Sequence, residues 1–170
     1  MAVHNPGMSF LNLWRALRAV PAGLLASASS ALAEAPSPSS VQVWVDPGLY
    51  SYHLKARNLR EDNYGVGVGV YVTPEHGFVA GSLINSNRRR SRYGAYHWRP
   101  WHWTPGPVRI SAGFIAGLID GYPSTNDGNP FPIVLPVLSA EYGPVGANLS
   151  FIPYPRARAA IALQLRLRVW

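Results

Sequence analysis

The sequence contains no cysteine, which excludes a disulfide framework and a thiolate metal site. It also contains no apolar run approaching the roughly 18 residues that a transmembrane helix needs. Charged residues are scarce, at 14% of the chain, although 48% of the residues are hydrophobic. No strong helical periodicity follows residue 40. Such a chain either encloses a large core in water or turns apolar surface toward lipid.

Proline and glycine are abundant instead, with 16 residues of each, which is too many for a helical protein. Two apolar segments between residues 126 and 152 are joined by a short turn and are punctuated or bounded by Pro130, Pro132, Pro136, Pro144 and Pro153. Proline within and at the ends of such segments disfavours helix. The chain then ends on an alternating segment, Ile161–Trp170. These features predict a small β-barrel of an outer membrane.

Segments with strand character recur along the rest of the chain, most of them about 10 residues long, the length that a tilted strand needs to cross a bilayer. There are eight: Leu49–Asn58, Tyr64–Thr73, Gly77–Ser86, Arg92–Trp101, Val108–Ile119, Phe131–Tyr142, Val145–Pro153 and Arg158–Trp170. We therefore expect an all-β fold, an eight-stranded, antiparallel, up-and-down transmembrane barrel over residues 49–170. The chain is expected to be a monomer.

The first 33 residues are typical of a secretory signal peptide. Arg15 and Arg18 supply the basic region, Ala19–Leu32 is apolar and rich in small residues, and Ala31–Ala33 fits a cleavage site. The alternative is an amphipathic helix that stays attached. Residues 34–48 are expected to be a linker with a lead-in strand. A signal peptide and a barrel together predict the outer membrane of a Gram-negative bacterium, with Met1 or Met8 as the true start.

The connections between the expected strands alternate in character. The first, third, fifth and seventh are polar, charged or long, and the others are turns. Outer-membrane barrels keep long loops outside and short turns on the periplasmic side. The arginine cluster Arg88–Arg90 then faces outward, where it would meet the phosphates of lipopolysaccharide. A solvated loop is the other reading, whereas nucleic acid is disfavoured because the chain is exported and carries no recognition motif.

Alternation within segments predicts which side chains face lipid. Val66, Val68 and Val70 would face outward, while Gly65, Gly67 and Gly69 would face the lumen. The glycines either leave room for an acyl chain or relieve crowding in a narrow barrel. In the last segment Ile161, Leu163, Leu165, Leu167 and Val169 would face lipid, with Gln164, Arg166 and Arg168 inside. Tyr93, Tyr96, Trp98, Trp101 and Trp103 would form an interfacial belt, or core residues in a soluble barrel.

The stretch Pro130–Val145, followed by Phe151–Pro153, resembles the C-terminal half of the PagP family of outer-membrane lipid A palmitoyltransferases. Ala112–Ile119 also resembles the fifth strand of that family. The resemblance is good over residues 110–153, patchy over 49–100 and absent before 45. It implies an eight-stranded barrel with an interior acyl pocket. It also implies an enzyme that moves an acyl chain from a phospholipid to lipid A without a cofactor.

The resemblance also assigns site residues. The family's catalytic histidine matches His53, and its catalytic Asp-Ser pair matches Asn85 and Ser86. Asn85 can donate a hydrogen bond to an oxyanion but lacks a carboxylate, and Glu61 and Asp62 are the nearest acidic residues by topology. Arg88 and Arg89 would pair with lipid phosphates.

The resemblance further places lateral-access prolines at Pro47 and Pro153. The floor of the acyl pocket falls at Gly94 or Tyr96, depending on a one-residue gap. Tyr96 at the floor would shorten the pocket.

Three functions stay open on the sequence. One is acyl transfer using His53 and Ser86, with outer-membrane phospholipid and lipopolysaccharide as partners. A second is a non-catalytic barrel that is structural or binds lipid, in which His53 is a polar lumen residue and Ser86 belongs to a turn. A third is a lipid hydrolase or deacylase built on the same two residues. No metal site is expected, because the histidines show no ligand spacing.

Overall fold

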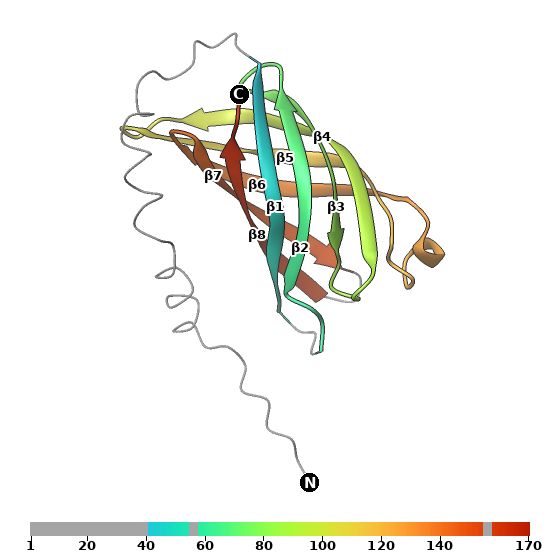
Figure 1. Cartoon of the computed structure of the whole chain (residues 1–170). Coiled ribbons are helices and arrows are strands. Elements are labelled where there is room, and N and C mark those ends of the chain that lie inside the picture. The colour runs from blue at the N-terminus through green and yellow to red at the C-terminus, as the bar shows by residue number, and fades with distance from the viewer. Residues whose placement is uncertain (1–40, 55–57, 155–157) are drawn as a thin grey trace. The chain divides into compact units, whose positions relative to one another are not determined.

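The computed structural model describes residues 41–54, 58–154 and 158–170. Eight antiparallel strands follow one another around a closed barrel, and β1 pairs with β8 to complete it (Figure 1). The strands are β1 (Gln42–His53), β2 (Asp62–Tyr71), β3 (His76–Ile84), β4 (Arg90–Trp103), β5 (Val108–Ile119), β6 (Phe131–Tyr142), β7 (Val145–Tyr154) and β8 (Arg158–Arg168). A 3-10 turn, Asn126–Gly128, lies between β5 and β6. The predicted all-β, up-and-down barrel of eight strands is confirmed.

Strand bounds agree best where apolar alternation and turn residues act together. β5 and β6 begin and end where the sequence predicts. β1 begins at Gln42 rather than Leu49, so the expected lead-in strand is part of the barrel wall. The predicted signal peptide lies outside the described residues. Within the described ranges no helix is long and apolar enough to span a membrane.

The two ends of the barrel differ. At the terminal end, which carries Gln42 and Arg168, the connections are residues 72–75, 104–107 and 143–144. The tightest is Gly143-Pro144, where Tyr142 pairs directly with Val145 and Gly143 has a positive φ of 56°. At the opposite loop end the connections include residues 54–61, 85–89 and 120–130. The β1–β2 and β5–β6 connections at the loop end are therefore the longest in the barrel, whereas only three residues separate β7 from β8 at that end.

The barrel wall is apolar outside and largely polar inside. Of the described residues, 25 large hydrophobic side chains are exposed, whereas seven hydrophobic and fifteen polar or charged residues are buried. In β2, Val66 is 59% exposed. In β8, Leu165 is 58% exposed, whereas Arg166, which lies between Leu165 and Leu167, is only 3% exposed. The predicted inward and outward phases of β2 and β8 are thus correct, and the polarity is inverted relative to a protein folded in water.

The lumen glycines make room for side chains of other strands. A Cβ added to Gly67 or Gly81 would lie 2.2 or 2.6 Å from the Tyr93 hydroxyl, and one added to Gly69 would lie 3.0 Å from a guanidinium nitrogen of Arg166. Real Cβ atoms essentially never show contacts under 3.0 Å, and a contact of 3.0 Å is tighter than nine in ten of those they make. The space beside these glycines is already occupied, which agrees with the interpretation that they relieve crowding in a narrow barrel.

The terminal half of the lumen is filled by what we call the aromatic–arginine plug: Trp44, Asp46, Tyr71, Arg99, Glu141 and Arg166. The Arg166 guanidinium lies 4.6 Å from the Trp44 ring centre, and that of Arg99 lies 4.1 Å from the Tyr71 ring centre. Arg99 pairs with Glu141, and Arg166 with Asp46 at 3.4 Å. Because the plug closes this half, the free space of the lumen lies toward the loop end.

Candidate functional site

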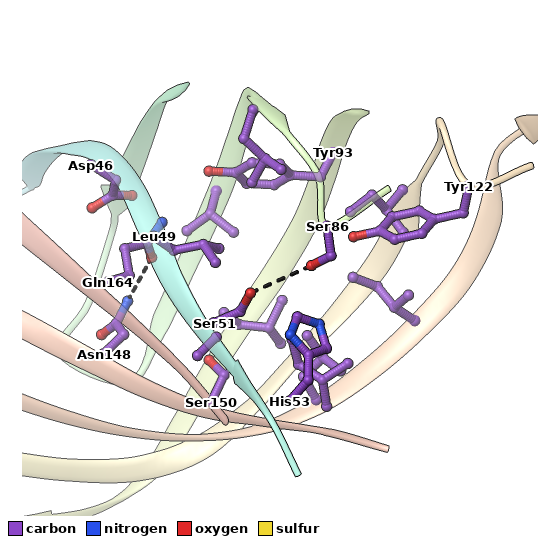
Figure 2. Close-up of a pocket in the computed structure, with 18 residues that line it drawn as sticks. Asp46, Leu49, Ser51, His53, Ser86, Tyr93, Tyr122, Asn148, Ser150 and Gln164 are labelled. Atoms are coloured by element: carbon purple, nitrogen blue, oxygen red, sulfur yellow. Dashed lines mark hydrogen bonds between the residues drawn. The ribbon is translucent and has the colours of Figure 1, made fainter. Parts of the chain in front are cut away.

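A cavity of about 110 Å³ occupies the lumen between the plug and the loop end. Its walls are apolar and come mainly from β3, β5, β6 and β7: Val79, Leu83, Ile115, Ile119, Ile133, Leu135 and Ile152. Polar residues gather at its two ends, with Asp46, Asn148 and Gln164 toward the plug and Ser51, His53, Ser86 and Tyr122 toward the loops (Figure 2). The cavity thus offers an apolar shaft beneath a polar mouth, a form that suits a hydrocarbon chain joined to a polar group.

His53 and Ser86 meet at that mouth. His53 ends β1 and Ser86 follows β3, yet both line the cavity and are only 8% and 7% exposed. Figure 2 shows their side chains projecting into the same end of the cavity. The His53 Nδ1 atom is buried and has no hydrogen-bond partner among the described residues. A buried ring nitrogen without a partner beside a hydroxyl is able to bind or deprotonate a ligand group.

A hydrogen-bonded chain behind Ser86 was not foreseen from the sequence. The Ser51 hydroxyl lies 3.4 Å from that of Ser86 and donates to the Asn63 amide oxygen at 2.6 Å. The Asn63 amide nitrogen donates in turn to the Ile84 carbonyl at 3.0 Å. Ser51 lies two residues before His53, so strand alternation places both on one face. Asn63 had no such signal, because only the β1–β2 register brings it to this place.

Asn85 does not reach the cavity. Its side chain is fully buried, and its amide nitrogen donates to the Ser91 hydroxyl at 2.9 Å and to the Gly121 carbonyl at 2.7 Å. Its amide oxygen accepts from the backbone N–H groups of Asn87 and Arg89. Both ends of the amide are therefore used in holding the β3–β4 connection against the β5–β6 connection. This arrangement leaves Asn85 no hydrogen for an oxyanion, so the expected catalytic role does not fit its position.

Of the two acidic candidates, Glu61 is the one whose negative charge acts on His53. Its backbone carbonyl accepts from the Ser51 N–H at 2.7 Å, and its carboxylate accepts from the Tyr50 hydroxyl at 2.6 Å. The carboxylate is close enough to act on His53 electrostatically. Asp62, the other acidic candidate, points elsewhere and pairs with Arg60 at 3.0 Å.

The residues expected to line an acyl pocket fall into two groups, one facing the lumen and one on the outer face of the barrel. Gly65, Gly67 and Gly69 lie on lumen-facing positions of β2, but the cavity walls do not include them. Gly94 and Tyr96 occupy the outer face of β4, where Gly94 is exposed and the Tyr96 hydroxyl hydrogen-bonds His76 Nδ1. The residue that enters the lumen from this part of β4 is Tyr93, which the sequence analysis placed in the interfacial belt. A one-residue difference in phase explains both departures.

The expected lateral-access prolines lie at or beside interruptions of the barrel ladders. Pro47 sits at a bulge of β1, and pairing with β8 skips from Val45 to Tyr50. Pro153 lies beyond the end of the β6–β7 ladder, whose last pair is Val137–Ser150. Pro132 and Pro136 lack N–H groups in the unpaired part of β6, while its pairing to β5 is complete. The missing donors therefore face β7.

An apolar groove on the outer wall reaches this unpaired region. It has a volume of about 390 Å³ and is lined by Trp101, Phe114, Pro136, Leu138, Leu149, Phe151 and Ile161 among others. Ser150 lines both this groove and the lumen cavity. The outer surface and the interior thus approach each other where the β6–β7 ladder ends.

The arginine cluster Arg88–Arg90 spans the end of the β3–β4 connection and the first residue of β4, and it begins two residues after Ser86. All three residues are exposed and form no ion pair with a described residue. Arg88 has a positive φ of 60°, and its N–H donates to the Asn85 carbonyl at 2.9 Å. Three unpaired cations are therefore held on a braced hairpin beside the cavity mouth.

The described part of the chain holds no group of three or more His, Cys, Asp or Glu side chains placed to bind a metal ion. The site is therefore defined by His53, Ser86, Ser51 and Asn63 above an apolar cavity, with the arginine cluster outside it. The sequence matches no protein-family model and no curated protein at a significant level.

Proposed function

We propose that this protein is an outer-membrane acyltransferase that moves an acyl chain from a phospholipid to lipid A. The observation that carries the proposal is the meeting of His53 and Ser86 at the mouth of an apolar lumen cavity. An acyl ester needs an apolar site for its chain and polar groups at its carbonyl, and the cavity offers both in that order.

The outer surface of the barrel supports a membrane location. Each of the eight strands exposes at least one large apolar side chain, and β2 and β4–β8 expose two or more. Monomeric proteins in water rarely expose apolar patches of more than a few hundred Å². The exposed Trp98, Trp101 and Trp103 lie near the terminal end of β4, where an aromatic belt would meet lipid headgroups. With that end in the periplasm, the loop end and its arginine cluster face the lipopolysaccharide leaflet.

A route for the phospholipid chain is suggested by the β6–β7 ladder. Backbone donors are missing there because of Pro132 and Pro136, and the outer groove and the lumen cavity share Ser150. A chain lying against the outer wall would have the shortest path into the lumen at this point. The arginine cluster would bind the phosphates of the acceptor or of the donor headgroup through charge-assisted hydrogen bonds.

His53 is the general base in this proposal. Its ring takes the proton of the acceptor hydroxyl as the hydroxyl oxygen attacks the donor ester, and the ester C–O bond breaks to release a lysophospholipid. The same proton passes to the departing glycerol oxygen, so the imidazole is regenerated. The Glu61 carboxylate would favour the transient imidazolium electrostatically.

One observation favours a second candidate, a barrel that binds lipid without transferring it. Asn85 stands where the resembling family has a catalytic carboxylate, and its amide is committed to bracing two loops. If catalysis needs a carboxylate on that side of the cavity, the chain would retain the lipid site alone.

Mass spectrometry of lipid A separates these functions. The full chain, His53→Ala and Ser86→Ala would be expressed in a Gram-negative host that lacks an acyltransferase of this kind. We expect lipid A with one additional acyl chain from the full chain and much less from either variant. An unmodified lipid A profile that matches both variants would support the lipid-binding barrel, and lipid A with one acyl chain fewer would support a hydrolase.

A further inference from the structure

The direction of the hydrogen bonds behind Ser86 is fixed by the Asn63 amide. Its nitrogen donates to the Ile84 carbonyl, since the reverse orientation would set two carbonyl oxygens against each other. The Asn63 oxygen therefore faces Ser51, and the 2.6 Å contact requires the Ser51 hydroxyl to donate its single proton there. Ser51 then has only lone pairs left for Ser86, at 3.4 Å. The Ser86 proton is accordingly drawn toward Ser51 rather than toward His53.

Burial strengthens the hydrogen bonds that link Ser86, Ser51 and Asn63. Ser51 and Asn63 are each 2% exposed, so water does not compete for their hydrogen bonds. A polar network in such surroundings is stronger than in water, and any unmade bond in it is costly. Figure 2 shows Ser51 and Ser86 joined across the cavity mouth with the His53 ring facing the same space. His53 Nδ1, by contrast, has no described partner and stays available to a ligand.

We propose that Ser51 and Asn63 are positioning residues that hold the Ser86 proton away from His53, so that Ser86 does not attack the acyl ester. The acyl chain then passes directly from the phospholipid to the acceptor hydroxyl, and no acyl-Ser86 forms. Ser86 contributes its lone pairs to a second donor group of the acceptor, a neighbouring hydroxyl or amide N–H, and so orients the acceptor toward the donor carbonyl. His53 removes the single proton of the attacking hydroxyl. This inference rests on the proposed acyl transfer, and it assigns Ser86 a binding role within it.

Labelling with a serine-directed phosphonylating reagent tests the inference without lipid A or phospholipid. The full chain would be purified in detergent and incubated with dodecyl fluorophosphonate, in which a serine oxygen displaces fluoride from phosphorus while a base takes the serine proton. Modification of Ser86 would be followed by peptide mass spectrometry. We expect slow modification in the native chain. In Ser51→Ala we expect a rise of about tenfold, because the Ser86 proton is then free to reach His53.

Several variants make the result specific. Asn63→Ala frees the Ser51 proton and should also speed modification of Ser86, which provides a second route if Ser51→Ala fails to fold. Ser111→Ala removes another buried serine, one that does not line the cavity and whose hydroxyl has no partner among the described residues, and should behave as the native protein does. In the double variant Ser51→Ala/His53→Ala, the increase in the rate of Ser86 modification should disappear. Circular dichroism would establish that each variant retains its β structure.

The inference is overturned if Ser86 of the native chain is modified as fast as in folded Ser51→Ala, or if an acyl-Ser86 peptide accumulates during turnover. Failure of the proposed acyl transfer would give a different set of results. Lipid A would then stay unmodified in cells while the labelling rates still rose in Ser51→Ala and Asn63→Ala, which would support the assigned direction of the Ser86 proton.

Discussion

Asn85 shows how one atom changes the role of a residue. An aspartate at this position would lose both hydrogen bonds that the Asn85 amide nitrogen gives to Ser91 and Gly121. It would also set a carboxylate oxygen against the Gly121 carbonyl. We therefore expect Asn85→Asp to lower the free energy of unfolding by about 1–3 kcal/mol, as for a buried polar group left without its partner. Urea unfolding in lipid vesicles measures this difference.

The matched control is Asn87→Asp. Asn87 is exposed on the same hairpin, and only its backbone N–H takes part in the bracing, so its substitution should change stability by less than about 0.5 kcal/mol. An Asn85→Asp protein that is as stable as the native chain and more active in acyl transfer would contradict this account. It would show that a carboxylate is tolerated there and serves catalysis.

At the scale of strands, the end of the β6–β7 ladder is where a chain could enter the barrel. Continuing the register beyond Val137–Ser150 would bring Leu135 opposite Ile152, and both line the cavity. The native chain has no cysteine, so a Leu135→Cys/Ile152→Cys pair can be oxidised without competing thiols. We expect oxidation to close the gap and abolish most of the acyl transfer, and reduction to restore it. Lipid A mass spectrometry under both conditions provides the measurement.

A second pair controls for the disulfide itself. Ala140 and Ala147 are already paired within the ladder, on its outer face and outside the apolar groove, so a disulfide between cysteines at these positions should leave transfer unchanged. If both oxidised proteins remain fully active, the acyl chain does not pass between β6 and β7.

The strands also show what could be predicted from sequence and what could not. Apolar alternation and turn prolines suffice for β5, β6 and the outward face of β8, because each is a local pattern. The inward turn of Tyr93 was missed because aromatic residues suit both a lumen and an interface. Asn63 was missed because its partners, Ser51 and Ile84, come from other strands and depend on register. His53 and Ser86 were found only through the family resemblance.

At the scale of the whole molecule, the aromatic–arginine plug closes the terminal half of the lumen with buried ion pairs. Removing the charge of Arg99 alone would leave Glu141 buried without its partner, since the two are 1% and 7% exposed. We expect Arg99→Met to lower the free energy of unfolding by about 3–5 kcal/mol. Arg99→Met combined with Glu141→Met should recover most of that loss, because no unpaired charge then remains. A double variant no more stable than the single one would mean that the arginine stabilises chiefly through the Tyr71 ring.

The inverted polarity of the barrel gives the sharpest test of where the protein resides. Leu165 is 58% exposed within β8, two residues beyond the centre of the strand, and Trp170 is 79% exposed at the chain end. In water, replacing either exposed residue by arginine should change stability by less than about 0.5 kcal/mol. In a bilayer, the cost depends on depth: about 2–4 kcal/mol near the midplane and about 0–1 kcal/mol at the interface. We therefore expect Leu165→Arg to destabilise the barrel strongly in lipid vesicles and Trp170→Arg hardly at all. Equal, small effects of both substitutions would place the apolar wall against something other than lipid, and the proposed acyl transfer between membrane lipids would fall with it.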